Sequence, residues 1–275
     1  MTEIFQKISE LIKNNRPFVL TTIVKTEGST PGKLGFRMIV ESENVTHGTI
    51  GGGMIEREVV FEAIRRMKSR ENGVVEYLLS GDAPIDKEQA KVLKMSCSGR
   101  AWVLYEVFGV KPKVYIFGGG HVGQALLKQL SLLNFYKVLI DNRPEFANKE
   151  KNPFADEIIL ANYIEYAFSF SPDESDFVIL MTHGHNYDFD ILKTIYKRKL
   201  NVRYIGVIAS KSKSHKLKKD ILQNIGNHVD FSNLYTPIGL DIGGSTPQEI
   251  ALSIAAELQA ILYGKTKVAS LSKTD

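Results

Sequence analysis

Hydrophobic and polar positions follow two different patterns along the chain, with a change near residues 108–113. The first part begins with an amphipathic segment whose apolar residues are spaced as in a helix. A second helix is predicted from about Gly53 to Arg70, because apolar side chains recur there on one helical face. Between and after these helices, short apolar stretches predict strands at residues 17–26, 37–42, 44–50, 73–80 and 101–108. Residues 1–108 therefore predict a smaller mixed α+β domain, in which residues 82–96 have no clear element.

From residue 113 onward, short apolar stretches alternate regularly with amphipathic helices. Strands are predicted at 113–117, 136–141, 156–160, 176–181 and 202–208, and helices at 122–133 and 188–199. Apolar strands separated by helices are typical of parallel strands that are buried on both faces. We therefore expect an α/β protein whose C-terminal domain, residues 113–275, is a Rossmann-like doubly wound parallel sheet.

A glycine-rich turn follows the first strand of this second domain. Gly118, Gly120 and Gly123 fit the pattern G-x-G-x-x-G, and the next strand ends in Asp141, 23 residues after Gly118. In dinucleotide-binding folds such glycines allow a tight turn, the approach of a pyrophosphate and close helix packing, while the acid binds ribose hydroxyls. Two further candidate contacts are His121 and Arg143. The turn predicts a site for NAD or NADP; the alternative is a Rossmann-like fold whose nucleotide site is vestigial.

Another triple-glycine run, Gly51–Gly53, also stands between a predicted strand and a predicted helix. It lacks the third glycine of the fingerprint, so by itself it predicts only a tight strand–helix turn. The stretch Gly28–Thr30 is followed by a proline, with Lys33 and Arg37 nearby. Small residues beside basic ones predict either an anion-binding loop or an ordinary surface loop.

His183 and His185 come directly after a predicted parallel strand, so they should lie at the carboxyl edge of the sheet, where ligands of such sheets bind. A His-x-His pair could bind a metal ion. No third ligand follows at a recognisable spacing, however, and a polar loop that lines the crevice is the preferred interpretation.

Two features of the C-terminal helices can also be predicted: the character of a basic helix and the start of the last helix. Residues 210–220 are basic without interleaved aromatic residues, which favours a solvated helix face over a nucleic-acid patch. Thr246 and Glu249 have the spacing of a capping box, with Pro247 at the first turn of the helix that follows.

Composition narrows the class of protein. The 275 residues carry a net charge of only +4, so a general affinity for nucleic acid is not implied. Cys97 is the single cysteine, which excludes an internal disulfide and favours a reducing compartment. No apolar stretch approaches the roughly 20 residues of a membrane span, and the N-terminus does not resemble a signal peptide. We expect a cytoplasmic protein that does not bind a membrane.

Several longer motifs together resemble the XdhC/CoxI family, the accessory proteins of xanthine and carbon monoxide dehydrogenases. They occur in the family's order from about residue 18 to residue 262. The motifs are TEGSTPGKLGFRMIV, GTIGGGMIE, MSCSGR, FGGGHVGQAL, MTHGHNYD, IGVIAS and PIGLDIGGSTPQEIALSIAAEL. The chain departs from the family pattern in having Ser98 between Cys97 and Gly99, Met54 after the first glycine run, and Gly32 directly after GSTP.

The resemblance implies a carrier or chaperone of molybdenum cofactor rather than a turnover enzyme. Such a protein supports sulfuration of the cofactor with a cysteine desulfurase and inserts it into a molybdenum hydroxylase client. Cys97 would then be a sulfur relay or a molybdenum ligand, in a cleft between the domains. The residues that would hold the cofactor are Gly28, Ser29, Thr30, Gly51, Gly52, Gly53 and Glu56.

Two other classes of function remain open. One is an NAD(P)-dependent oxidoreductase, for which His183 is the only plausible acid or base, since no Tyr-x-x-x-Lys pair follows the fingerprint. The other is a regulatory module that senses a nucleotide without chemistry. The oligomeric state is open as well, a homodimer included.

Overall fold

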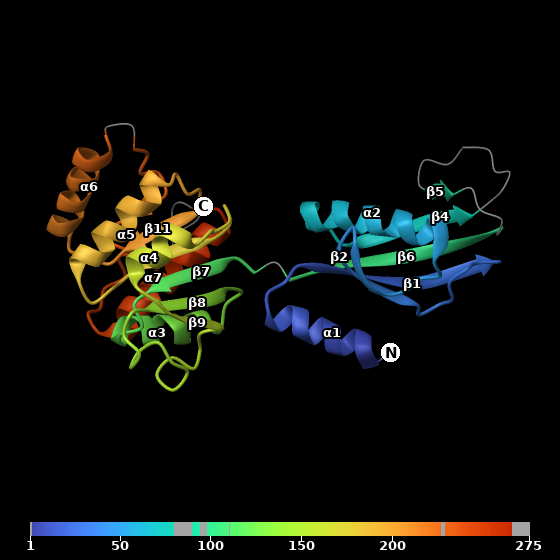
Figure 1. Ribbon diagram of the computed structural model, residues 1–275, viewed down its shortest axis with the longest axis horizontal. Coiled ribbons are helices and arrows are strands. Elements are labelled where there is room, and N and C mark those ends of the chain that lie inside the picture. Colours follow the sequence, from blue (N-terminus) through green and yellow to red (C-terminus); the bar gives the residue numbers. More distant parts are fainter. Residues whose placement is uncertain (1, 80–89, 94–97, 110, 227–228, 266–275) are drawn as a thin grey trace, which may run out of the picture. The chain divides into compact units, whose positions relative to one another are not determined.

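The computed structural model describes residues 2–79, 90–93, 98–109, 111–226 and 229–265 (Figure 1). The chain forms two compact units, residues 1–110 and residues 111–275. Each unit contains one six-stranded sheet. None of the helices in the described part of the chain combines the length and the apolar character that a membrane crossing requires.

The first unit contains a sheet of parallel and antiparallel strands, with one helix packed on each face. Its strand order is β3-β2-β1-β6-β4-β5, in which β4 and β5 pair in parallel and the other neighbours are antiparallel. The elements are α1 (Thr2–Lys13), β1 (Phe18–Gly28), β2 (Arg37–Ser42), β3 (Val45–Gly48), α2 (Gly53–Ser69), β4 (Gly73–Leu79), β5 (Ala90–Leu93) and β6 (Gly99–Phe108). The short strand β5 falls in the stretch for which no element was predicted.

Burial on both faces explains why β1 reads as a continuous apolar run. Val19 and Ile23 pack with the apolar face of α2, whereas Phe18 and Leu20 pack with Leu11 of α1. Because side chains alternate along a strand, one run of residues supplies both layers. The two helices lie on opposite faces of the sheet (Figure 1).

The second unit is an all-parallel sheet in the order β12-β11-β10-β7-β8-β9. Read from the other edge, the strands follow the 3-2-1-4-5-6 order of dinucleotide-binding folds, which confirms the predicted fold class. The elements are β7 (Lys113–Phe117), α3 (His121–Leu130), β8 (Tyr136–Asp141), β9 (Glu157–Leu160), α4 (Tyr163–Ser169), β10 (Phe177–Leu180), α5 (His185–Lys197), β11 (Tyr204–Val207), α6 (Lys211–Ile225), β12 (Leu234–Tyr235) and α7 (Pro247–Leu262). The pattern missed α4 and β12, which are the shortest helix and the shortest strand described in this unit.

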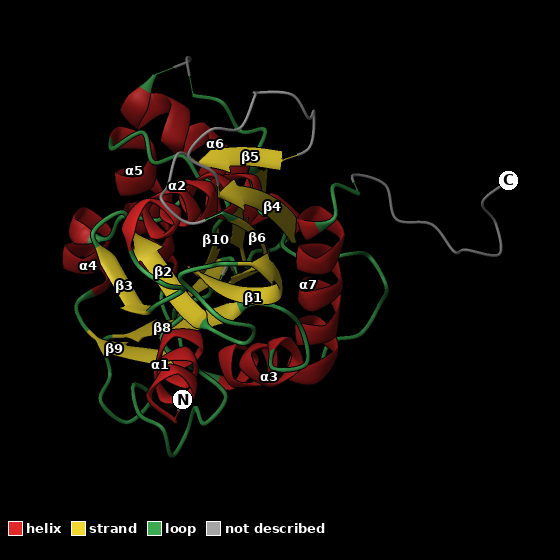
Figure 2. Ribbon diagram, turned by 90° about the vertical axis from the view of Figure 1, so that its right-hand side faces the viewer, coloured by secondary structure: helices red, strands yellow, loops and turns green. Residues whose placement is uncertain are grey.

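Helices cover both faces of this sheet. Figure 2 draws the helices in red and the strands in yellow. Residues of α3 and α7 pack with one side of the strands, and residues of α4, α5 and α6 pack with the other. The chain turns from one face to the other between β9 and β10. The switch point of the fold therefore lies between the neighbouring strands β7 and β10.

One buried polar contact lies within the core of the first unit. The hydroxyl groups of Tyr77 on β4 and Tyr105 on β6 are 2.5 Å apart, and both side chains are fully buried. Burial raises the pKa of both phenols, so both stay neutral, and among the described residues each hydroxyl has the other as its hydrogen-bond partner.

We expect Tyr105→Phe to lower the free energy of unfolding of the first unit by about 1–3 kcal/mol, because it leaves the Tyr77 hydroxyl buried without a partner. The double variant Tyr77→Phe/Tyr105→Phe should recover part of that loss, since no orphaned hydroxyl remains. Trp102 on β6 is the single tryptophan, so denaturant titration followed by its fluorescence reports on this unit. A double variant that is as unstable as the sum of the two single variants would contradict the pairing.

Candidate functional site

The glycine turn after β7 lies at the switch point of the parallel sheet. Gly118 has a φ of +121°, and a Cβ added there would stand 2.4 Å from the carbonyl oxygen of Met181, which follows β10. A Cβ on Gly123 would stand 2.1 Å from the carbonyl oxygen of Gly118. A Cβ on Gly120, in contrast, would have nothing within 4 Å. Two of the glycines are thus required by backbone packing, and the middle one faces open space.

The first turn of α3 offers backbone donors and contains no acidic residue of its own. Gly120 is the N-cap residue, it makes no side-chain capping bond, and the first turn contains no acidic residue. Amide groups of a first helical turn have no intrahelical acceptors, and the helix dipole favours an anion beside them. His121 is the first residue of the helix and is exposed. This turn therefore suits a phosphate group.

Asp141 lies at the end of β8, where the fingerprint predicts it, but its carboxylate is already engaged. It is fully buried and accepts hydrogen bonds from the amides of Gly119 at 2.7 Å and Arg143 at 3.0 Å. The Arg143 guanidinium donates two more, at 2.9 Å to Oδ1 and 2.8 Å to Oδ2. Although burial raises the pKa of Asp141, these donors outweigh it, so that the pKa lies below its ordinary value.

The expected role of Asp141 as an acceptor for ribose stays a prediction, and it would require these contacts to change. A carboxylate that is buried and holds four donors does not reach a sugar unless Arg143 moves away. The guanidinium also stacks over the ring of Phe146, with 4.0 Å from its central carbon to the ring centroid. The tip of β8 therefore carries an Arg143–Asp141 ion pair in place of a free carboxylate.

His183 lies at the predicted carboxyl edge, between β10 and α5. Its side chain is exposed, and its ring centroid lies 5.2 Å from that of Tyr187 and 6.2 Å from that of Tyr163. His185 begins α5, but its side chain is outside the described residues. Within the described part of the chain, no three His, Cys, Asp or Glu side chains are grouped as metal ligands would be.

The other triple-glycine run lies in the first unit and already holds an anion of its own. Gly51, Gly52 and Gly53 all have positive φ, at 125°, 74° and 68°. The carboxylate of Glu56 accepts hydrogen bonds from the amides of Ile50 at 3.2 Å and Gly52 at 3.0 Å. It also accepts one from the hydroxyl of Thr49 at 2.6 Å, and that hydroxyl accepts from the amide of Gly51 at 3.0 Å.

The amides of Ile50, Gly51 and Gly52 in this turn therefore already have acceptors within the chain. The glycines do form an anion-binding turn, but the carboxylate of Glu56, in the first turn of α2, occupies it. The space around the turn is nevertheless open, since a Cβ on Gly52 would have nothing within 4 Å, and Gly53 and Met54 are exposed.

Close backbone contacts bring this turn together with two other predicted segments. The strand ends at Gly28 and Gly99 are paired, and a Cβ on Gly28 would lie 2.8 Å from the carbonyl oxygen of Ser98. A Cβ on Gly32 would lie 2.0 Å from the carbonyl oxygen of Ile50. The loop from Gly28 to Gly32 thus bridges the glycine run and the start of β6. Cys97, directly before Ser98, lies outside the described residues.

The second copy of GSTP, at residues 244–247, serves a different purpose. Thr246 and Glu249 form the predicted capping box at the start of α7, and the Glu249 carboxylate also accepts from the amide of Ser245 at 2.9 Å. This turn is satisfied by its own helix, in the same way as the turn before α2.

Two family profiles match the chain. The XdhC Rossmann domain matches residues 114–258, and the profile described as the XdhC and CoxI family matches residues 11–78. The chain belongs to the XdhC and CoxI family.

Relatives of this XdhC-family chain include two curated bacterial proteins. The uncharacterized protein YqeB of Escherichia coli (strain K12) is 29% identical over 93% of this chain and 45% of its own length. A protein of Bacillus subtilis (strain 168), named as a probable xanthine dehydrogenase subunit, is 29% identical over 54% of this chain and 42% of its own length. The chain thus spans less than half the length of either relative in these matches.

A solved structure shares the fold. A crystal structure of a xanthine dehydrogenase from Bacillus halodurans aligns over 97% of both chains, with a TM-score of 0.51 and 24% identity. At this identity the likeness shows the fold alone. The sites of the XdhC-family chain therefore have to be argued from its own residues.

We expect Glu56→Ala to lower the free energy of unfolding of the first unit by about 1–3 kcal/mol, because the amides of Ile50 and Gly52 lose their acceptor. Added phosphate should restore part of this stability in the variant and have a much smaller effect on the wild type, since the free ion then fills the place of the carboxylate. Thermal unfolding with and without phosphate, in a buffer without other oxyanions, measures both effects. The variant Glu58→Ala on the same helix is the matched control. A phosphate effect of equal size in wild type and Glu56→Ala would contradict this account of the turn.

Proposed function

We propose that the chain is a maturation factor for a xanthine dehydrogenase-type molybdenum hydroxylase, acting in the cytoplasm. It would bind molybdenum cofactor, support its sulfuration together with a cysteine desulfurase, and insert it into the client enzyme. Family membership supports the role in maturation. The name of the Bacillus subtilis relative supports the connection with xanthine dehydrogenase.

The observation that carries this proposal is the convergence of three loops in the first unit. The segments Gly28–Gly32, Ile50–Gly53 and Ser98–Gly99 meet through backbone contacts that only glycine permits. Their exposed surface consists of small and polar groups, including Ser29, Gly53 and Ser98. An anionic ligand with a phosphate fits such a surface, and it would take over the amide groups that Glu56 now holds.

Molybdenum cofactor, when bound, supplies a metal centre that can carry a terminal sulfur. The residues of the chain would hold its phosphate at the Gly51–Gly53 turn and its polar ring edge along Ser29 and Thr30. Cys97 is the single thiol of the chain and directly precedes the third loop, so it is the candidate to contact the metal or relay sulfur. Displacement of Glu56 by the phosphate would couple cofactor binding to a change at the start of α2.

We expect Cys97→Ser to fold as the wild type does and to lose retention of molybdenum cofactor. Both proteins are loaded under anaerobic conditions and desalted, and the remaining molybdenum and pterin are measured. Circular dichroism checks the fold, and Trp102 fluorescence checks the first unit. Equal retention by the serine variant would remove Cys97 from the site, and a wild-type protein that retains no pterin would overturn the carrier proposal.

A second activity, binding of a nucleotide at the turn between β7 and α3, is favoured by the open first turn of α3. We propose that the pyrophosphate lies against Gly120 and that Arg143 makes NADP a better ligand than NAD. Nucleotide binding would either regulate the carrier or take part in a redox step. In the second case the chain would be an oxidoreductase, and His183 would have to act as the acid or base. The exposed position of His183 at the carboxyl edge is compatible with that role.

We expect Gly120→Val to abolish nucleotide binding without loss of stability, because the added side chain has room in the fold but stands where the pyrophosphate must lie. Gly123→Val is the contrasting variant, since its side chain would collide with the backbone at Gly118 and destabilise the unit. Titration calorimetry with NADP and NAD, together with thermal unfolding, separates the two effects. Unchanged affinity of Gly120→Val would show that the fingerprint is structural only.

A further inference from the structure

One side of α6 in the second unit is exposed and basic. Lys211, His215, Lys216 and Lys219 are all exposed. Because successive residues of a helix lie about 100° apart around its axis, these four fall within one arc of about 140°. Asp220, the single acidic residue of α6, falls outside this arc. The four residues are called the basic face of α6 below.

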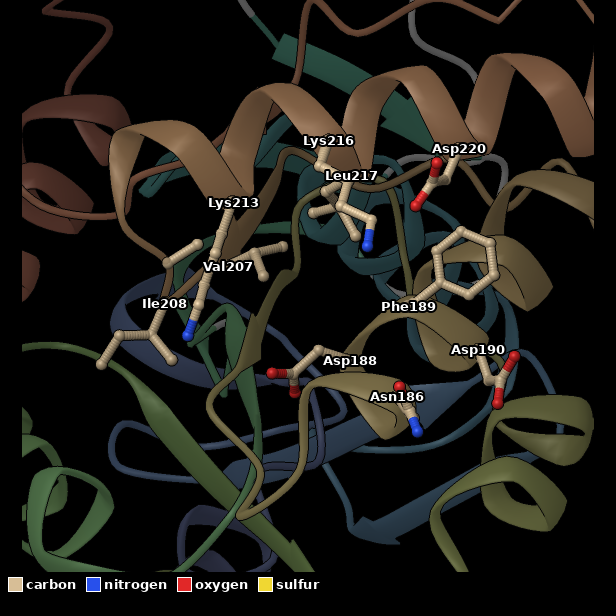
Figure 3. Close-up of a pocket in the computed structure, with 11 residues that line it drawn as sticks. Asn186, Asp188, Phe189, Asp190, Val207, Ile208, Lys213, Lys216, Leu217 and Asp220 are labelled. Atoms are coloured by element: carbon tan, nitrogen blue, oxygen red, sulfur yellow. The ribbon is translucent and has the colours of Figure 1, made fainter.

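One margin of the basic face borders a cavity between α5 and α6 (Figure 3). Lys216 and Lys213 both line this cavity, together with the carboxylate of Asp188 from α5. Lys213 is already engaged within the chain and is not counted in the basic face. In the described part of the chain, Lys211, Lys216 and Lys219 form no ion pair. The charge of the basic face is therefore left for something outside the chain.

The placement of the lysines opposes the stability of the helix. The first turn of α6 contains no acidic residue, and its last turn contains no basic one. Cations are favourable near the C-terminus of a helix, but the lysines of α6 all lie between Lys211 and Lys219, and the helix continues to Ile225 without another. Lys216 and Lys219, three residues apart, also repel each other. Helix stability therefore does not explain the basic face, which points to a role in binding.

The composition of α6 distinguishes between the anionic surfaces that could bind there. Leu217, Ile221 and Ile225 pack into the core, and no large apolar side chain among the described residues of α6 is exposed for insertion into a membrane. The helix contains no aromatic residue on which nucleic-acid bases could stack. It also contains no arginine, the residue that suits a bidentate contact with phosphate. Hydrated lysines suit the dispersed carboxylates of an acidic protein surface.

We propose that the basic face of α6 docks the acidic surface of a partner protein. Exposed lysines attract such a surface over about a Debye length, so the contact speeds association and weakens with added salt. The helix begins after β11, at the same carboxyl edge of the parallel sheet as the glycine turn after β7, so the partner would lie beside that edge. This docking role goes beyond the proposed function and needs neither of its ligand sites.

The probe is a fluorescently labelled poly-L-glutamate peptide, which carries carboxylates but no phosphate or aromatic group. Fluorescence anisotropy with the full chain should show tighter binding at an ionic strength of about 10 mM than at about 150 mM, because the Debye length falls from about 30 Å to about 8 Å. Lys211→Gln/Lys216→Gln/Lys219→Gln should weaken binding at low ionic strength by at least about tenfold, since three exposed ion pairs are lost. In thermal unfolding this variant should be at least as stable as the wild type.

The matched control is Lys128→Gln/Lys151→Gln/Lys197→Gln, which removes the same charge from exposed lysines elsewhere in the second unit and should leave the affinity nearly unchanged. Equal weakening by the control, or no binding of the probe by the wild type, would overturn the proposal. Tighter binding to phosphatidylglycerol vesicles or to single-stranded oligo(dT), at equal concentration of negative charge, would overturn it in favour of a membrane or a nucleic acid. Failure of the cofactor-retention experiment leaves these outcomes unaffected, because α6 and the cofactor loops belong to different units.

Discussion

Backbone amides at glycine turns need acceptors, and this constraint organises the candidate sites of both units. Two of the turns are satisfied by a carboxylate of the helix that follows: Glu56 serves the turn before α2, and Glu249 serves the turn before α7. In the fingerprint turn before α3, Asp141 accepts from the amide of Gly119 only. The first turn of α3 has no acidic residue of its own. Turns that look alike in the sequence therefore differ in whether an external anion has to compete with a carboxylate.

This difference separates the two parts of the proposed function. Under this proposal, a ligand at the first unit would have to displace Glu56, so its binding would be linked to a rearrangement around α2. A nucleotide at the second unit would meet the first turn of α3, which has no acidic residue, and Arg143 where a free acid was expected. Both features arise from carboxylates that hold loops together.

Long periodic segments were predictable, and short ones were not. The second unit followed from alternating apolar strands and amphipathic helices, because parallel strands buried on both faces have a distinctive composition. The four-residue β5 and the two-residue β12 carry too few side chains for any period to show. The helix α4 begins at a capping asparagine, Asn162, whose side chain accepts from two amides. That residue was the available signal, and it is weak by itself.

The sequence by itself determined the fold class, the fingerprint turn, the cap of α7 and the family, since these depend on local spacing and on long motifs. Only the tertiary structure decided which donors and acceptors are already engaged. That Glu56 fills its own glycine turn, that Arg143 covers Asp141, and that two lysines of a basic stretch line a cavity all depend on side-chain placement. Residue type states what a group can bind, but its neighbours in space decide whether it is still available.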